Sequence, residues 1–247
     1  MDDPVFSYEI IHELIESGIK FEAVIFFNNP PISMRRLGVL FFVYGPIFFI
    51  KFVVLYIYWN ILKGGRIKKF LDLSRVSHHE FSQYEMPKAM DFVENISPDL
   101  MVSVFCNIKL PHEMLSLAKI GGINLHQGKL PDYRGLMPIF YCQINGENTI
   151  GSSVHLMSDK FDAGQIIAEG LLPISAGDDY PTLWKSINKI GAKNLINVIN
   201  AYIQTGQLQK GRPQPYLGKY YGLPTIKMAL FYWIDMTKSR LRAKNFK

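Results

Sequence analysis

The sequence predicts an α/β protein with a mostly parallel sheet, an apolar helical-hairpin insert and a basic C-terminal helix or tail. Helical and strand-like segments alternate along most of the chain, which is typical of parallel strands joined by crossover helices. A long apolar run at residues 37–62 interrupts this alternation, and the chain ends in an aromatic and then basic stretch. We expect a main domain over residues 1–205, with the insert at about 33–64, and a C-terminal extension over 206–247.

The elements follow from apolar spacing and from helix start and stop residues. Apolar residues recur at helical spacing over 5–15, and Gly18 ends this helix before the β-rich run 21–27. Proline is favoured in the first turn of a helix. The pattern beyond the insert predicts helices over 87–96, 111–120 and 181–205, each with a proline at its start, and strands over 100–106, 121–126, 150–157 and 166–174.

One element is missing from this order. A doubly wound domain opens with a strand whose carboxyl end forms part of the ligand crevice, whereas this sequence begins at the loop that would follow it. Two interpretations remain open: the domain lacks that strand, or the true start of the protein lies upstream of Met1.

The composition excludes several classes of protein. The chain has 247 residues, of which 48% are hydrophobic and 19% charged, so it is neither disordered nor collagenous. Its two cysteines, Cys106 and Cys142, form no CxxC motif and no cluster with histidine, so we expect no disulfide framework and no metal site. The acidic, amphipathic N-terminus is unlike a secretory signal, and the sequence therefore predicts a cytoplasmic protein.

The net charge of +6 is concentrated in two segments. Residues 35–70 contain seven basic residues and no acid, and the last ten residues contain five basic residues and no acid. The first group flanks the apolar run LGVLFFVYGPIFFIKFVVLYIYWNIL, which is not how nucleic-acid surfaces are built, so we expect no nucleic-acid partner.

The apolar run is expected to form two helices. Ser33 can cap the first, Pro46 can begin the second, and Gly64-Gly65 can end it. Three placements remain open for this hairpin: in an anionic membrane interface, packed on the body, or in a homodimer interface. A full crossing is disfavoured, because it would place the helix and strand before residue 30 across the membrane from their sheet.

Two polar motifs carry the candidate chemistry. The first is INLHQGKLPDYRGLMP, where Asn124 and His126 lie two apart on a short strand, so that both side chains leave the same face. The second is SSVHLMSDKFDAGQII, where a strand with His155 runs into a loop with Asp159 and Asp162. An amide and an imidazole at the carboxyl end of a strand suit the polarisation of a carbonyl, and a loop carboxylate can reach that imidazole.

Together these motifs resemble the signature of the folate-dependent formyltransferases, which include glycinamide ribonucleotide, methionyl-tRNA and sugar N-formyltransferases. The resemblance covers roughly residues 98–205, and it implies a Rossmann-like formyltransferase fold with 10-formyltetrahydrofolate as the formyl donor and no metal. It implies that Asn124, His126 and Asp162 are catalytic. Chemically, Asn124 and a protonated His126 can donate to the oxyanion, while Asp162 orients the imidazole and assists removal of the amine proton.

Further residues are expected to bind the cofactor or the acceptor. The segment FCNIKLP resembles the family's pterin-binding stretch, which suggests Asn107 and Leu110 as cofactor-binding residues, together with Asp159 and Gly164 in the second motif. In the first motif, after the strand that carries Asn124 and His126, we expect Gln127, Tyr133, Arg134 and Gly135 to bind the acceptor, and Gln127 departs from the proline of many relatives. His155 is expected to be structural, and His78, His79 and His112 are expected on the surface or in loops.

The sequence narrows the choice of acceptor amine by disfavouring two known acceptors of this family. The sequence has DDPVFSY where the glycinamide enzyme has a glycine-rich phosphate loop, and acidic side chains repel a phosphate. Only some forty residues follow the last core helix, against a further domain of about a hundred in the tRNA enzyme. A nucleotide-linked or lipid-linked amino sugar of surface-polysaccharide biosynthesis is therefore expected, with tRNA or glycinamide ribonucleotide as alternatives.

The C-terminal stretch TIKMALFYWIDMTKSRLRA has the composition of an interfacial anchor. It favours a peripheral location on the inner face of the cytoplasmic membrane. Two other functional classes remain: a non-catalytic folate-binding scaffold, which has no need of all three catalytic residues, and an enzyme that hydrolyses the formyl donor.

Overall fold

The computed structural model describes residues 6–28, 33–106 and 108–245, and within these the side chains of residues 7–239. The helices, in chain order, are α1 (Phe6–Glu16), α2 (Met34–Tyr44), α3 (Pro46–Tyr56), α4 (Arg66–Leu73), α5 (Met86–Ile96), α6 (His112–Leu115), α7 (Pro138–Ile144), α8 (Tyr180–Thr205) and α9 (Ile226–Asn245). A π-helical segment at Ile57–Leu62 continues α3, and a 3₁₀ turn at Gln83–Glu85 precedes α5. The strands are β1 (Val24–Asn28), β2 (His78–Ser82), β3 (Met101–Val104), β4 (Gly122–His126), β5 (Arg134–Gly135), β6 (Thr149–Leu156), β7 (Ile166–Pro173) and β8 (Tyr220–Tyr221).

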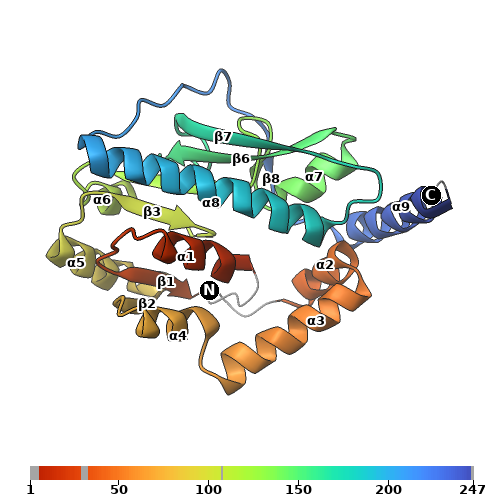
Figure 1. Cartoon of the computed structure of the whole chain (residues 1–247), viewed down its shortest axis with the longest axis horizontal. Coiled ribbons are helices and arrows are strands. Elements are labelled where there is room, and N and C mark those ends of the chain that lie inside the picture. Colours follow the sequence, from red (N-terminus) through yellow and green to blue (C-terminus); the bar gives the residue numbers. More distant parts are fainter. Residues whose placement is uncertain (1–5, 29–32, 107, 246–247) are drawn as a thin grey trace.

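The strands form an α/β architecture with helices on both faces (Figure 1). β1 pairs with β2 in parallel, and a separate sheet has the order β3-β4-β6-β7. β3 and β4 are parallel, whereas β6 runs antiparallel to both β4 and β7. The parallel α/β class is confirmed, with an antiparallel β6–β7 pair that we did not expect. No helix separates these two strands, so a short loop reverses the chain.

Most expected elements are present, and the differences have local causes. The helix expected over 111–120 ends at Leu115, because the next N–H groups, those of Leu117 and Ala118, donate to the carbonyls three residues back at 3.2 and 3.4 Å and form turns in place of a continued α-helix. His78 and His79, expected on the surface or in loops, are half-buried and lie in a strand. Both lie in β2, where they pair with Val24 and Ile25 of β1.

The two helices of the hairpin insert differ in their environment. Ser33 caps α2 by accepting a hydrogen bond from the Arg36 N–H at 3.2 Å, and Pro46 begins α3, as expected. α2 packs on the body and on α9, where the rings of Phe42 and Trp233 lie 6.3 Å apart. α3 instead has Phe52 as its one buried residue, and its Ile47, Ile50 and Val54 side chains are exposed.

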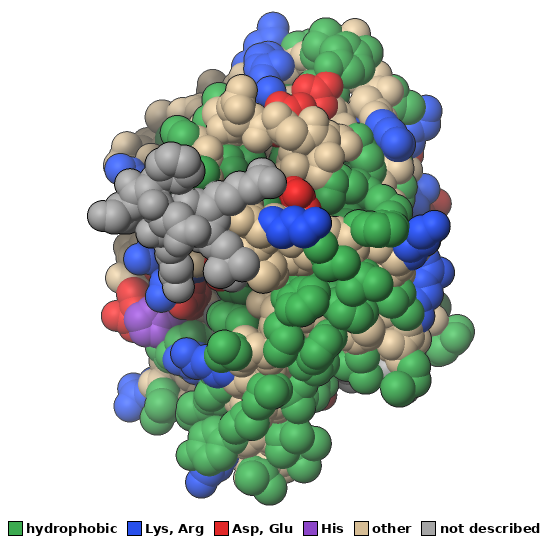
Figure 2. All heavy atoms as spheres, turned by 90° about the vertical axis from the view of Figure 1, so that its right-hand side faces the viewer, with side chains coloured by type: hydrophobic (Ala, Val, Ile, Leu, Met, Phe, Trp, Pro, Cys, Tyr) green, Lys and Arg blue, Asp and Glu red, His purple; other side chains and the backbone are tan. Residues whose placement is uncertain are grey.

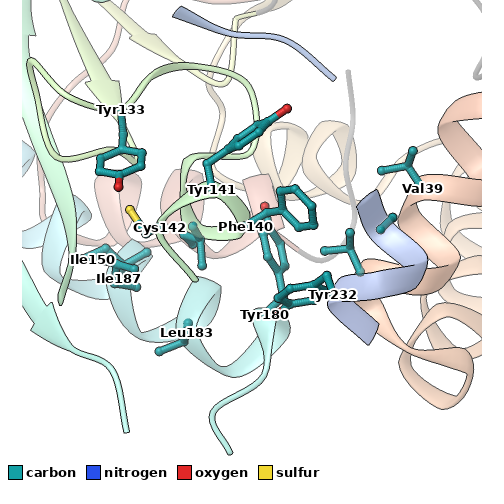
Figure 3. Close-up of a cluster of buried hydrophobic side chains, with 13 residues drawn as sticks. Val39, Tyr133, Phe140, Tyr141, Cys142, Ile150, Tyr180, Leu183, Ile187 and Tyr232 are labelled. Atoms are coloured by element: carbon teal, nitrogen blue, oxygen red, sulfur yellow. The ribbon is translucent and has the colours of Figure 1, made fainter. Parts of the chain in front are cut away.

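A hydrophobic cluster joins the insert, the main domain and the C-terminal extension (Figure 3). It contains Val39 of α2, Phe140 of α7, Tyr180 and Leu183 of α8, and Tyr232 of α9. The extension also returns to the sheet region, since β8 pairs with β5. Residues 206–239 are therefore built into the same body as the main domain.

Within the described residues, no single helix is long and apolar enough to cross a membrane. Pro46–Leu62 and Arg66–Leu73 satisfy length and composition only as a pair, and that pair is bent by 55°.

Candidate active site

The candidate site lies on one face of the central sheet. Asn124 of β4 stands in register with Ser103 of β3 on one side and with His155 of β6 on the other. Side chains in register on adjacent strands project to the same face. The pairing therefore aligns a hydroxyl, an amide and an imidazole in one row.

His155 belongs to this site, which the sequence analysis did not anticipate. Its Nε2 lies 3.1 Å from Asn124 Nδ2 and 3.5 Å from Asp162 Oδ1, while its Nδ1 lies 2.8 Å from the carbonyl of Leu156. The Nδ1–H therefore donates to that carbonyl, which leaves Nε2 to contact the amide and the carboxylate. The signal available in the sequence was that His155 is a polar residue within the alternating pattern of the strand expected over 150–157.

His126 ends β4 with its ring between two acceptors. Its Nε2 lies 2.7 Å from the carbonyl oxygen of Tyr133, and its Nδ1 lies 3.6 Å from Asp162 Oδ1. The Nε2–H therefore donates to the Tyr133 carbonyl, and Nδ1 faces the Asp162 carboxylate at ion-pair distance. Gly128 makes this placement possible, because a Cβ there would collide with the His126 ring and the Tyr133 carbonyl.

Asp162 is held in a strained backbone conformation beside both histidines. Its φ is 53°, in the left-handed region that non-glycine residues rarely adopt. Its Oδ2 accepts the Gly135 N–H at 2.8 Å. Burial would raise the pKa of the Asp162 carboxyl, but His126, His155 and the Gly135 N–H together hold it well below its usual range. The site therefore holds a buried carboxylate.

Arg134 positions the loop that carries Asp162. Its Nε and one terminal nitrogen donate to the Phe161 carbonyl at 3.0 and 2.5 Å, and the other terminal nitrogen donates to the Gly218 carbonyl at 3.0 Å. Gln214 of the C-terminal extension donates to the carbonyls of Asp162 and Gly164 at 3.0 and 2.8 Å. The C-terminal extension thus helps to shape the site.

The residues expected to bind the acceptor lie close to the site but are mostly buried. The Tyr133 ring lies in the hydrophobic cluster, and its hydroxyl donates to Glu147 at 2.8 Å, so only its carbonyl faces His126. Gly135 contributes its N–H to Asp162. Gln127 is buried, and its Nε2 has no hydrogen-bond partner in the part of the chain that the structure describes. Direct contact of these residues and of Arg134 with an acceptor remains a prediction.

A small cavity adjoins the polar row. It measures about 50 Å³, and its lining includes the polar Asn124, His155 and Asp162 and the apolar Ile108, Leu110 and Met157. Of the residues expected to bind the cofactor, Leu110 lines this cavity, while Asp159 is exposed, 3.9 Å from the ring nitrogen of His112. Gly164 lies where a Cβ would strike the Leu156 carbonyl, and Asn107 falls outside the described residues.

Among the described residues, no group of three or more histidine, cysteine or acidic side chains is arranged to hold a metal ion. The site instead combines an amide, two imidazoles and a carboxylate beside a partly apolar cavity. Such a set can donate to a carbonyl oxygen as negative charge develops on it, and the carboxylate can accept a proton.

Comparison with known proteins gives consistent results. A family profile described as Formyl transferase matches residues 69–199. Methionyl-tRNA formyltransferase of Enterococcus faecalis is 29% identical over 199 residues, which are 81% of this chain and 56% of that protein. The chain spans about half the length, or less, of the curated relatives that it matches.

Solved structures share the fold. Phosphoribosylglycinamide formyltransferase from Bacillus halodurans matches with a TM-score of 0.62 and 13% identity, over 81% of this chain and 93% of that chain. The formyltransferase PseJ from Anoxybacillus kamchatkensis, in complex with a UDP-linked formamido sugar and tetrahydrofolate, matches with a TM-score of 0.51 and 21% identity, over 63% of this chain and 79% of that chain.

Proposed function

The chain belongs to the formyl transferase family, and on that premise we propose that it transfers a formyl group from 10-formyltetrahydrofolate to the primary amine of a nucleotide-linked amino sugar. The profile match confirms the resemblance noted in the sequence. The observation that carries the proposal is the convergence of Asn124, His155 and Asp162 on one cavity, with His126 Nδ1 3.6 Å from the Asp162 carboxylate.

The residues around the cavity fit the reacting end of such a donor. 10-Formyltetrahydrofolate would supply an electrophilic formyl carbon. Asn124 Nδ2 is placed to donate to the formyl oxygen, and Ile108, Leu110 and Met157 offer an apolar wall to a flat ring. The ionised Asp162 is placed to hold a protonated His126 in orientation and to take the proton that the acceptor amine loses.

An exposed aromatic surface beside Asp162 supports a nucleotide or sugar as acceptor. Phe161, Tyr216 and Tyr220 are 38%, 54% and 48% exposed, and the rings of Phe161 and Tyr220 lie 6.2 Å apart. Burial of part of Tyr220 raises its pKa, and the nearby Asp162 carboxylate raises it further. Exposed aromatic faces stack on bases and sugars, and the exposed Lys109 and Lys160 at the cavity can neutralise a diphosphate or a folate carboxylate.

The proposal predicts formyl transfer to a defined acceptor class. The purified protein, incubated with 10-formyltetrahydrofolate and UDP- or dTDP-linked amino sugars, is expected to yield a product heavier by one formyl group in mass spectrometry. The same panel should include lipid-linked amino sugars, methionyl-tRNA, glycinamide ribonucleotide and a reaction without acceptor. Formylation of methionyl-tRNA instead would assign the activity named in the curated relatives, formate release without acceptor would indicate hydrolysis, and no turnover would indicate a binding protein.

We further propose that the enzyme works on an anionic membrane surface, to which α3 and the π-helical segment bind. One face of this segment carries Ile47, Ile50, Val54, Ile57 and Ile61, which recur every three or four residues and are 43–89% exposed. Figure 2 shows hydrophobic side chains gathered over the lower part of this side of the molecule, the region of α2 and α3. An exposed apolar stripe flanked by cations is typical of helices that lie in a membrane interface.

The side chains around this stripe carry a net positive charge, but some of the basic residues counted in the sequence contact other side chains. Lys68 pairs with Glu80 at 2.6 Å, and the Arg66 guanidinium stacks on the Tyr8 ring at 3.6 Å. Lys51, Lys63 and Lys69 are exposed, and no acid lies between residues 35 and 70. Each basic residue near an anionic surface contributes about 1 kcal/mol to binding.

Membrane binding is expected to depend on the apolar stripe. The triple variant Ile47→Gln, Ile50→Gln, Val54→Gln should float with phosphatidylglycerol-containing vesicles at least tenfold less than wild type, because glutamine removes buried apolar area from the interface. The control variant Tyr84→Gln, Leu171→Gln changes equally exposed residues elsewhere and should float like wild type. Wild-type protein that fails to float at low salt, or a triple variant that floats equally well, would contradict the proposal.

A further inference from the structure

The backbone around Asp162 is held in place by side chains from distant parts of the chain. The Phe161 carbonyl accepts hydrogen bonds from Arg134, and the carbonyls of Asp162 and Gly164 accept hydrogen bonds from Gln214 at 3.0 and 2.8 Å. The φ of 53° at Asp162 lies in a region that costs a non-glycine residue free energy. The loop between β6 and β7 therefore depends on these outside donors to keep the conformation that directs the carboxylate toward the two histidines.

The Gln214 side chain uses both hydrogens of its amide on this loop. Its Nε2 donates to two carbonyls, which flank Ala163 on either side. Because a carbonyl only accepts hydrogen bonds, the NH2 group of the amide must face the loop and Oε1 must face away from it. Oε1 is buried and has no hydrogen-bond partner in the part of the chain that the structure describes. The two donated bonds are therefore what Gln214 contributes to this loop.

Gln214 lies on a segment that is anchored at both ends. We call this segment, residues 211–221, the strap. Near its start, the Arg212 backbone exchanges two hydrogen bonds with Ile166 of β7, at 2.8 and 2.9 Å. At its end, β8 pairs with β5, the strand from which a backbone N–H donates to Asp162 Oδ2. The strap therefore connects the base of the loop to the strand that binds the Asp162 carboxylate, with Gln214 between them.

We propose that Gln214 is a positioning residue for formyl transfer. Its amide fixes the peptide groups that follow Asp162, and so keeps the carboxylate 3.6 Å from His126 Nδ1 and 3.5 Å from His155 Nε2. The described lining of the small cavity includes Asp162 but not Gln214, so Gln214 acts through the carboxylate. The proposal rests on the function proposed above, and it makes the strap necessary for the reaction as well as for the fold.

Replacing Gln214 with methionine tests hydrogen-bond donation separately from packing. Methionine is similar to glutamine in length and volume, but it has no N–H to donate, and the change also removes the unpaired Oε1. The Tm of Gln214→Met is therefore expected to change little. Its kcat should fall by about 10–10²-fold, because the carboxylate moves from its productive position. The KM values of donor and acceptor should change by less than about threefold.

The matched control is Gln209→Met, because Gln209 is an exposed glutamine in the same C-terminal extension. It should leave kcat, KM and Tm unchanged. A Gln214→Met protein that keeps wild-type kcat, or that loses kcat only because it unfolds, would overturn the proposal.

The dependence on Asp162 is tested by combining two variants. If Gln214 acts only by placing the Asp162 carboxylate, Gln214→Met will lower kcat by less than about threefold in a protein that already carries Asp162→Asn. A double variant slowed by the product of the two single effects would show that Gln214 acts by another route, and would overturn the proposal.

A measurement without turnover separates this proposal from the proposed function. In heteronuclear NMR spectra, the imidazole signals of His126 and His155 should move in Gln214→Met toward their positions in Asp162→Asn, and they should stay unchanged in Gln209→Met. Unchanged histidine signals in Gln214→Met would overturn the positioning role even in a protein that transfers formyl groups. Shifted signals without a formylated product from any acceptor would support the positioning of the carboxylate and count against the proposed reaction alone.

Discussion

Replacing Asp162 with asparagine is expected to lower kcat by about 10²–10⁴-fold while leaving the protein folded. The amide keeps an oxygen that can accept the Gly135 N–H, so the loop geometry is retained. It removes the negative charge that lies 3.6 Å from His126 and 3.5 Å from His155, and with it the proton acceptor. The loss should therefore appear in kcat and only weakly in the KM of the acceptor.

The matched control is Asp235→Asn, which makes the same chemical change at an exposed position on α9. It should retain wild-type kcat. Steady-state formation of the formylated product measures both variants, and circular dichroism checks their folding. An Asp162→Asn protein with more than a tenth of wild-type kcat would show that the carboxylate is not required.

The same variant also tests how the Asp162 carboxylate affects the pH dependence of protein stability. The folded-state pKa of Asp162 lies below its unfolded value of about 3.9, so the ionised carboxylate stabilises the fold above that value. This contribution is lost as the pH falls below the unfolded value. The difference in unfolding free energy between wild type and Asp162→Asn should therefore shift against wild type as the pH is lowered from 6 toward 3, as urea unfolding at each pH would measure.

Sequence reasoning found those parts of the site that depend on local spacing. Asn124 and His126 share a face because they lie two apart on a strand, and Ser33 and Pro46 mark helix starts through local backbone chemistry. His155 was assigned a structural role because its contact with Asn124 depends on the antiparallel register of β6 on β4. That register is a tertiary feature, which single-strand periodicity does not report.

The remaining differences between the predicted and the observed structure also arise from tertiary contacts. β2 and its histidines gave no clear signal, since this strand is stabilised by pairing with β1 and by α5 packing on it. The sequence predicted the two helices of the apolar hairpin but not their different environments: α2 packs against α9, whereas α3 carries the exposed Ile47, Ile50 and Val54. A cavity of about 480 Å³ is lined by residues of both β1 and β3, and the two interpretations of the missing strand stay open.

Truncation of the Asn124 side chain is the second change with a large expected effect. Asn124→Ala removes the amide that lines the cavity and lies 3.1 Å from His155 Nε2, and the loss of one oxyanion donor typically costs about 10²–10³-fold in kcat. Asn197→Ala, at an exposed position on α8, is the control and should leave kcat unchanged.

The contact between Asn124 and His155 makes a sharper test possible through a double-mutant cycle. If the two side chains act as one unit on the developing oxyanion, the effects of Asn124→Ala and His155→Ala on kcat will not multiply, and the double variant will be only slightly slower than the slower single variant. Independent roles would give a double variant slowed by the product of the two effects. If Asn124→Ala alone retained full kcat, the amide would have no part in stabilising the transition state, and its bond to His155 would serve only to position the ring.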